Sequence, residues 1–105
     1  MKNEQLKKFV VNQLEEIKAK DLKVIDLPED NTIADYMVIC SGTSSRHVKS
    51  IAMLLIKSLK EENMPPLGIE GEDASEWVLV DCGDVVVHVM QPITRDYYQL
   101  EKLWE

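Results

Sequence analysis

Apolar positions recur along this chain with two different periods, which predicts a mixture of helices and strands. In Asn3–Lys20, and again from Arg46 to about Glu62, they return every three or four residues, as in amphipathic helices. Leu22–Leu27 alternates weakly and Tyr36–Cys40 is continuously apolar, and both patterns are typical of β-strands. Pro65 and Pro66 follow the second helical pattern and would end it, because proline cannot continue the hydrogen-bond ladder.

The clearest local pattern is a β-hairpin in the last third of the chain. Glu76–Asp81 and Asp84–Met90 are strand-like runs, and we predict that Cys82 and Gly83 form a two-residue turn between them. Because side chains alternate across a strand, this pairing gives the two strands different faces. One face would carry Val78, Val80, Val85, Val87 and Val89, and the other Trp77, Leu79, Val86, His88 and Met90. The valine face is expected to pack against the helices as core.

The remaining segments complete the fold prediction. Gly68–Gly71 is expected to be a short edge strand, and Thr94 is expected to cap a last helix with Tyr97, Leu100 and Leu103 on one side. The whole chain, 1–105, is then a single α/β domain with a mixed five-stranded sheet and helices mainly on one face. The connection from strand 36–40 through the long helix should be a crossover.

The second face of the hairpin has two possible interpretations. If three helices leave it open, it is an exposed apolar patch, and such patches mark binding surfaces. Tryptophan and methionine, here Trp77 and Met90, are enriched at interface centres. Alternatively, Trp77 packs under the first helix and His88 is a hydrogen-bonded core histidine. Residue types alone leave both interpretations open.

Composition narrows the possible partners. The chain has 105 residues with 19 acidic and 12 basic side chains, a net charge of −7. Scattered bases argue against a direct grip on the nucleic-acid backbone, whereas an acidic surface suits a basic protein partner. The charge could also serve solubility alone. No apolar run is long enough for a membrane span or an export signal, so we expect a cytoplasmic protein in which Cys40 and Cys82 are free thiols.

Candidate catalytic chemistry is weak throughout the chain. Gly42–Arg46 is similar to the small-residue loop of nucleotidyltransferases, but such enzymes need carboxylates that converge on Mg²⁺. Asp35, Asp81 and Asp84 are the available carboxylates, and none stands in a paired-acid motif beside the loop. A helix cap is the simpler role for the loop. His47 and His88 lack metal-ligand spacing, and a cysteine in an apolar strand is usually inert. We therefore expect no catalytic residue, metal or cofactor.

Four segments together resemble the ribosomal silencing factor family, also called RsfS or Iojap. They are DYMVICSGTSSRHV (Asp35–Val48), IEG (Ile69–Gly71), EWVLVDCGDVVVHVM (Glu76–Met90) and RDYYQLEKLW (Arg95–Trp104). The resemblance implies a nucleotidyltransferase-like fold without catalytic carboxylates. It also implies a non-enzymatic factor that binds the large ribosomal subunit through its fourteenth protein. There the factor would block joining of the small subunit and lower translation when nutrients are short.

This resemblance gives the second hairpin face a role. Our hypothesis is that Trp77 fills an apolar pocket on the partner, while Asp81 and Glu101 face basic side chains around it. The predicted partner-binding residues are Trp77, Leu79, Asp81, His88, Met90, Arg95, Tyr98 and Glu101. Arg95 could form an exposed polar-aromatic cluster with Tyr97 and Tyr98, although Tyr97 could equally be a core contact. Two alternatives stay open: a divergent nucleotide-binding enzyme that uses Ser44 and Arg46, and a homodimer that buries the same apolar face, since the family includes dimers.

Overall fold

The computed structural model describes residues 3–30 and 34–104. In chain order the elements are α1 (Asn3–Glu16), β1 (Lys20–Asp26), β2 (Tyr36–Ser41), α2 (Ser45–Glu61), β3 (Gly68–Glu70), β4 (Trp77–Asp81), β5 (Val85–Met90), α3 (Pro92–Tyr98) and the 3₁₀-helix η1 (Leu100–Trp104).

The strands form one five-stranded sheet in the order β1-β2-β5-β4-β3. Strand β2 runs parallel to β5, and the other neighbouring pairs are antiparallel. Because β3 therefore runs parallel to β2, the connection through α2 is a crossover that carries the chain to the far edge of the sheet. The predicted α/β class, mixed five-stranded sheet and crossover are confirmed.

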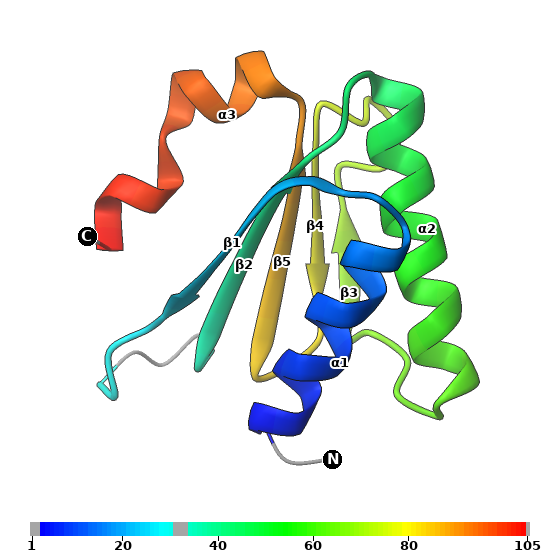
Figure 1. The fold of residues 1–105 in the computed structure, drawn as a ribbon, viewed down its shortest axis with the longest axis vertical. Coiled ribbons are helices and arrows are strands. Elements are labelled where there is room, and N and C mark those ends of the chain that lie inside the picture. The colour runs from blue at the N-terminus through cyan, green and yellow to red at the C-terminus, as the bar shows by residue number, and fades with distance from the viewer. Residues whose placement is uncertain (1–2, 31–33, 105) are drawn as a thin grey trace.

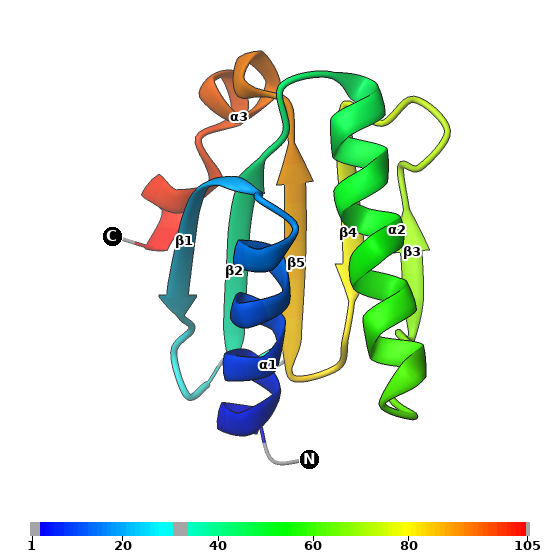
Figure 2. The same ribbon diagram turned by 45° about the vertical axis from the view of Figure 1, so that its right-hand side comes forward.

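The helices lie on both sides of this sheet, in unequal amounts. Helices α1 and α2 cover one face, and α3 and η1 lie on the opposite face, toward the β1 side (Figures 1 and 2). The main core lies under α1 and α2, where the valines of β4 and β5 meet the apolar stripes of both helices. The valine face is Val78, Val80, Val85, Val87 and Val89, each fully buried. Its prediction as core is confirmed, and a second, smaller cluster of Ile25, Ile39 and Met90 lies on the other face.

Helix α1 ends at Glu16, four residues before the predicted end. Lys18 adopts a left-handed conformation with φ 67°, and its N–H donates to the carbonyl of Glu15 while the N–H of Ala19 donates to the carbonyl of Leu14. This is the Schellman arrangement that closes many helices, usually with glycine at the left-handed position. A lysine at this position does not signal a helix end in the sequence. The predicted helix was therefore too long, and the predicted start of β1 was too late.

The hairpin turn is formed by Gly83 and Asp84, not by Cys82 and Gly83. The N–H of Cys82 donates to the carbonyl of Val85 at 2.9 Å, and Gly83 has φ 89°. Glycine at the first turn position allows this positive φ, as in type II′ hairpins. Leu79 therefore pairs with His88 rather than with Val86. The register moves by two residues, which is one full period of the strand, so every side chain stays on the face predicted for it.

The C-terminal segment also differs from the single predicted helix. Helix α3 begins at Pro92 instead of after Thr94, because proline fits the first helical position, and it ends at Tyr98. Gln99 then adopts a left-handed conformation with φ 49° before η1 begins. This break separates residues that were predicted to share one side. Leu100 packs against the second cluster, whereas Tyr97 is 79% and Leu103 71% exposed.

Candidate functional site

The sheet face opposite α1 and α2 carries a half-open surface that we call the Trp77 face. We define it by Glu70 of β3, by Trp77, Leu79 and Asp81 of β4, and by Tyr98 of α3. Glu70 pairs with Leu79, and alternate residues of β4 point the same way, so the strand residues share this face. Trp77, Leu79 and Asp81 are half-buried, while Glu70 and Tyr98 are exposed.

Trp77 is held between His88 and Tyr98. Its indole Nε1–H donates to Nδ1 of His88 at 2.9 Å, and its ring centroid lies 4.9 Å from that of Tyr98 with the planes tilted by 49°. His88 is 6% exposed, and burial lowers its pKa from 6.5 to about 4. The ring is therefore neutral at pH 7, with Nδ1 free to accept the bond. His88 is the hydrogen-bonded core histidine of the second interpretation, but Trp77 lies on the face away from α1.

An aromatic row continues from this pair to the surface. The ring centroids of Trp77 and His88 are 5.8 Å apart, and those of Tyr98 and Tyr97 are 5.0 Å apart in an edge-on arrangement. The row thus runs from the interior to Tyr97, which is exposed and is not the core contact that the sequence also allowed. Ile93 is 83% exposed beside it on the same helix. In a continuous helix Ile93, Tyr97 and Leu100 would share one face, and the break at Gln99 is what separates Leu100 from the other two.

A hollow of about 290 Å³ lies next to the exposed edge of Trp77, lined by Glu70, Gly71, Trp77 and Leu79. Gly71 has φ 87°, and a Cβ there would collide with the carbonyl oxygen of Trp77. Only glycine therefore lets the chain after β3 approach β4 so closely. Glu70 places an exposed carboxylate at the rim of the hollow. The hollow has an apolar floor and an acidic edge.

Asp81 has a role within the chain as well as a place on this face. Its Oδ1 accepts the N–H of Gly83 at 2.9 Å and so supports the hairpin turn. Asp is common at such positions for this reason. Its contact with a partner stays a prediction.

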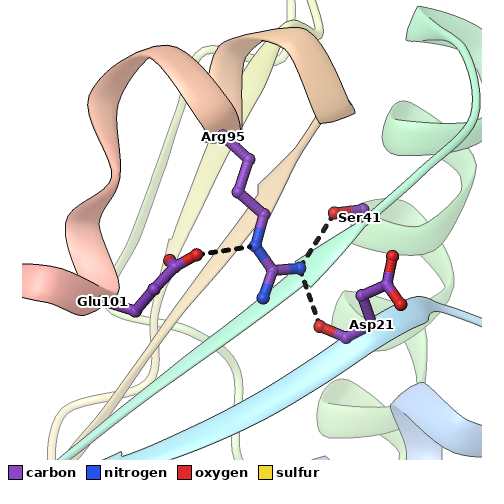
Figure 3. Close-up of polar contacts among 4 residues, drawn as sticks. All are labelled: Asp21, Ser41, Arg95 and Glu101. Carbon is purple, nitrogen blue, oxygen red and sulfur yellow. Dashed lines mark hydrogen bonds and ion pairs between the residues drawn. The ribbon is translucent and has the colours of Figure 1, made fainter.

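The side chains of Arg95 and Glu101, from α3 and η1, face each other, and the guanidinium also points toward Ser41 and Asp21 (Figure 3). Nε of Arg95 donates to Oε1 of Glu101 at 3.2 Å, and Nη1 donates to the main-chain oxygen of Asp21 at 2.7 Å and to Oγ of Ser41 at 2.9 Å. The Arg95 side chain is only 12% exposed. The predicted exposed cluster of Arg95 with Tyr97 and Tyr98 is therefore wrong, because three acceptors from β1, β2 and η1 draw the guanidinium inward.

The eight predicted contact residues thus fall into three groups. Trp77, Leu79, Asp81 and Tyr98 present surface; His88 and Met90 are buried beneath them; Arg95 and Glu101 form an internal pair. Met90 has no exposed surface and His88 very little, so in this conformation both could act only by supporting Trp77.

The small-residue loop lies at the opposite end of β2 from its candidate carboxylates. Ser44 caps α2 by accepting the N–H of His47 at 3.1 Å, and His47 Nδ1 accepts the N–H of Thr43 at 2.8 Å. Asp35 precedes β2 and its N–H donates to the carbonyl of Asp84, whereas the loop follows β2. A strand of six residues spans about 20 Å. A metal-dependent nucleotidyltransferase site is therefore not assembled from these residues.

Other chemical sites are equally sparse in the described part of the chain. Residues 3–30 and 34–104 contain no group of three or more His, Cys, Asp or Glu side chains placed to hold a metal ion. Cys40 and Cys82 are free thiols, and burial raises the pKa of each to about 12, so neither forms a thiolate near pH 7. Among the same residues, no helix combines the length and the apolar character needed to cross a membrane.

The sequence matches the profile of a family described as "Ribosomal silencing factor during starvation" over residues 1–105. The chain belongs to the ribosomal silencing factor family. A relative in Chromobacterium violaceum, named ribosomal silencing factor RsfS, is 42% identical over 99% of this chain and 85% of its own length. A Mus musculus relative, named mitochondrial assembly of ribosomal large subunit protein 1, is 44% identical over 91% of this chain and 43% of its own length.

A solved structure supports the same assignment. The crystal structure of a Chromobacterium violaceum protein, 42% identical, superposes with a TM-score of 0.94 over 99% of this chain and 87% of that protein. The family resemblance seen in the four sequence segments is thereby confirmed, and the Trp77 face can be considered as a surface of a ribosomal silencing factor.

Proposed function

We propose that this protein binds the large ribosomal subunit through its fourteenth protein and sterically blocks joining of the small subunit. Translation would then fall when nutrients are limiting. Family membership supports this proposal, as do the names of the relatives, which refer to ribosomal silencing and, in the mouse protein, to assembly of the large subunit. We place the activity in the cytoplasm, where ribosomal subunits join.

The observation that carries the proposal is the held, half-buried Trp77 beside an open hollow. Tryptophan is the residue most often found to dominate binding energy at interface centres. His88 and Tyr98 fix its ring from two sides, so little side-chain freedom remains to be lost on binding. Leu79 and the hollow add apolar area next to it. A partner could place an apolar side chain in the hollow and cover the indole edge.

Charge supports a protein partner over bare RNA. The net charge is −7, and the Trp77 face itself carries the carboxylates of Glu70 and Asp81. A phosphate backbone would be repelled by this surface, whereas lysines and arginines of a ribosomal protein would be attracted. We further propose that the factor acts by occupying a surface, without catalysis or cofactor. A nucleotide-binding role for Ser44 and Arg46 has less support, because Ser44 already caps α2.

A subunit-joining assay tests the proposal. Purified large and small subunits are mixed at fixed Mg²⁺ with rising amounts of the protein, and joining is followed by light scattering. We expect dose-dependent loss of the joined particle and co-sedimentation with the large subunit only. Trp77→Ala should weaken binding by about 30- to 1000-fold, equivalent to about 2–4 kcal/mol.

Leu54→Ala is the matched control. Leu54 is 43% exposed on α2, on the far side of the sheet, so this variant removes a large apolar side chain without touching the Trp77 face. It should inhibit joining like the unaltered protein. If the unaltered protein leaves subunit joining unchanged and does not co-sediment with the large subunit at any dose, the proposal is refuted.

The free protein is proposed to pair with a second copy through the same surface. This contact would extend onto the C-terminal segment that carries Tyr98, where Ile93, Tyr97 and Leu103 are each more than 70% exposed and a second copy could cover them. Mass measured with and without the large-subunit protein checks this: one face cannot serve both contacts at once, so the dimer should disappear as the complex forms.

A further inference from the structure

We propose that Arg95 and Glu101 are positioning residues that clamp the C-terminal segment 92–104 onto the sheet, so that Tyr98 holds Trp77 in the orientation a partner needs. The inference depends on the proposed function in taking Trp77 as the anchor. Neither Arg95 nor Glu101 would itself touch the partner; both would act through Tyr98.

One guanidinium joins segments that are distant in the sequence. Arg95 belongs to α3, Glu101 to η1, Ser41 to the end of β2, and the main-chain oxygen of Asp21 to the irregular start of β1 (Figure 3). Asp21 has φ 49° where the β1–β2 register shifts, and its oxygen accepts from Arg95. The planar fork of arginine can reach such separate acceptors at once, which a lysine ammonium on a flexible stem does poorly.

Other attachments of this segment are few in the described part of the chain. None of the seven residues of α3 is buried. Gln91, just before α3, fixes only the start of the segment: its N–H donates to the carbonyl of Glu76 at 2.9 Å and its side-chain amide donates to the carbonyl of Ser75 at 3.3 Å. A helix of this length is not stable alone in water. Leu100 packs on the second cluster, and Tyr98 contacts Trp77. The position of Tyr98 over Trp77 therefore depends strongly on the Arg95 contacts that flank it.

Because Arg95 and Glu101 are largely buried, the loss of either side chain should be costly. The side chains of Arg95 and Glu101 are 12% and 21% exposed, and Oε2 of Glu101 is buried without a hydrogen-bond partner among the residues that the structure describes. A partly buried ion pair contributes little net stability, but removing one member leaves the other charge uncompensated. The segment would then move outward to hydrate that charge, and Tyr98 would move with it.

The first experiment needs no partner. In the NMR spectrum of the full chain, nuclear Overhauser contacts between the rings of Tyr98 and Trp77 report the clamped segment. They should be lost in Arg95→Ala, with a shift of the Trp77 indole N–H, and kept in the control Arg46→Ala, which removes an exposed arginine from α2. Glu101→Gln, which keeps the side-chain shape, should weaken the same contacts and serves if Arg95→Ala does not fold. Ring contacts preserved in both variants would overturn the clamp.

The second experiment is a double-mutant cycle on affinity for the large-subunit protein. Arg95→Ala should weaken binding by about tenfold in the unaltered chain. In a Tyr98→Ala background it should weaken binding no further, because the group through which it acts is gone. Arg95→Lys should behave like Arg95→Ala, since the fork and not the charge is required. Full additivity, or rescue by lysine, would overturn the positioning role. If the unaltered protein does not bind the large-subunit protein, the proposed function is wrong. The ring contacts between Tyr98 and Trp77 still test whether Arg95 and Glu101 hold the C-terminal segment in place.

Discussion

His88 lies between Trp77 and the interior of the sheet, where one hydrogen bond and burial act together. Its Nδ1 accepts from the indole of Trp77, and the same burial that protects this bond lowers the pKa of the imidazole to about 4. A charged imidazolium would donate from both nitrogens and could not accept the indole proton. Keeping the ring neutral therefore keeps Trp77 in place over the whole physiological pH range.

His88 should make stability depend on pH in a defined window. In the unfolded chain the imidazole titrates near its ordinary pKa of 6.5, and in the folded chain near 4. As pH falls through this window the unfolded state binds the proton first, so the free energy of unfolding falls. The full effect is about 3 kcal/mol, complete near pH 4 and absent above about pH 7.

His88→Gln supplies the comparison, because its amide oxygen can still accept the indole N–H but does not titrate. Urea denaturation between about pH 4 and pH 7 should give a pH dependence in the unaltered protein that exceeds that of the variant by up to one proton. Equal slopes in the two proteins would contradict a depressed pKa for His88.

At the level of elements, the prediction of strand faces was correct where the hydrophobic periodicity was strong. The alternation of β4 and β5 placed Trp77 and Leu79 on one face and the valines on the other, and that assignment survived a two-residue error in the turn. The predicted ends of helices were wrong where a residue other than glycine or proline ended the helix. Lys18 and Gln99 both adopt left-handed conformations without any local signal of it in the sequence.

The inward position of the Arg95 side chain could not be predicted from the sequence for a different reason. The acceptors of Arg95 in β1 and β2 lie 74 and 54 residues away in the chain, and they become neighbours only through the sheet order and the irregular start of β1. Residue type alone suggested an exposed arginine among tyrosines. Long-range pairs of this kind follow from topology, and periodicity contains no information about them.

The connection after β3 offers a test at the same scale. Gly71→Ala places a Cβ against the carbonyl oxygen of Trp77 at a residue with φ 87°, so β3 and β4 must separate or the backbone must strain. We expect a loss of about 1–3 kcal/mol in the free energy of unfolding, measured by urea denaturation. The hollow beside Trp77 should also change shape, with weaker partner binding at a temperature where the variant is folded.

Gly68→Ala is the matched control, because nothing lies within 4 Å of a Cβ at Gly68 and its φ is not positive. Its unfolding free energy should stay within about 0.5 kcal/mol of the unaltered protein. A Gly71→Ala variant as stable as the Gly68→Ala variant would show that this close approach is not required.

For the whole molecule, one face of the sheet forms the main core and the other face carries the proposed binding surface. Helices α1 and α2 seal one face into the main core, and the short C-terminal segment covers only part of the other. The acidic character of the chain then matters for association rather than for folding. With a net charge of −7 and carboxylates at the rim of the open face, a basic partner should be attracted over distances comparable to the Debye length.

Association with the large-subunit protein should therefore slow as salt rises. Between about 0.01 M and 0.15 M ionic strength the Debye length shrinks from about 30 Å to about 8 Å, and the association rate should fall by about tenfold or more while dissociation changes little. Stopped-flow measurements on Glu70→Gln and Asp81→Asn should give shallower salt dependence, since each removes one charge from the Trp77 face. The amide oxygen introduced by Asp81→Asn could still accept the turn bond. Glu61→Gln, at the exposed end of α2 on the other side of the sheet, changes net charge equally and should leave the dependence close to that of the unaltered protein. If all three variants respond alike, the attraction comes from net charge alone and this face has no special electrostatic role.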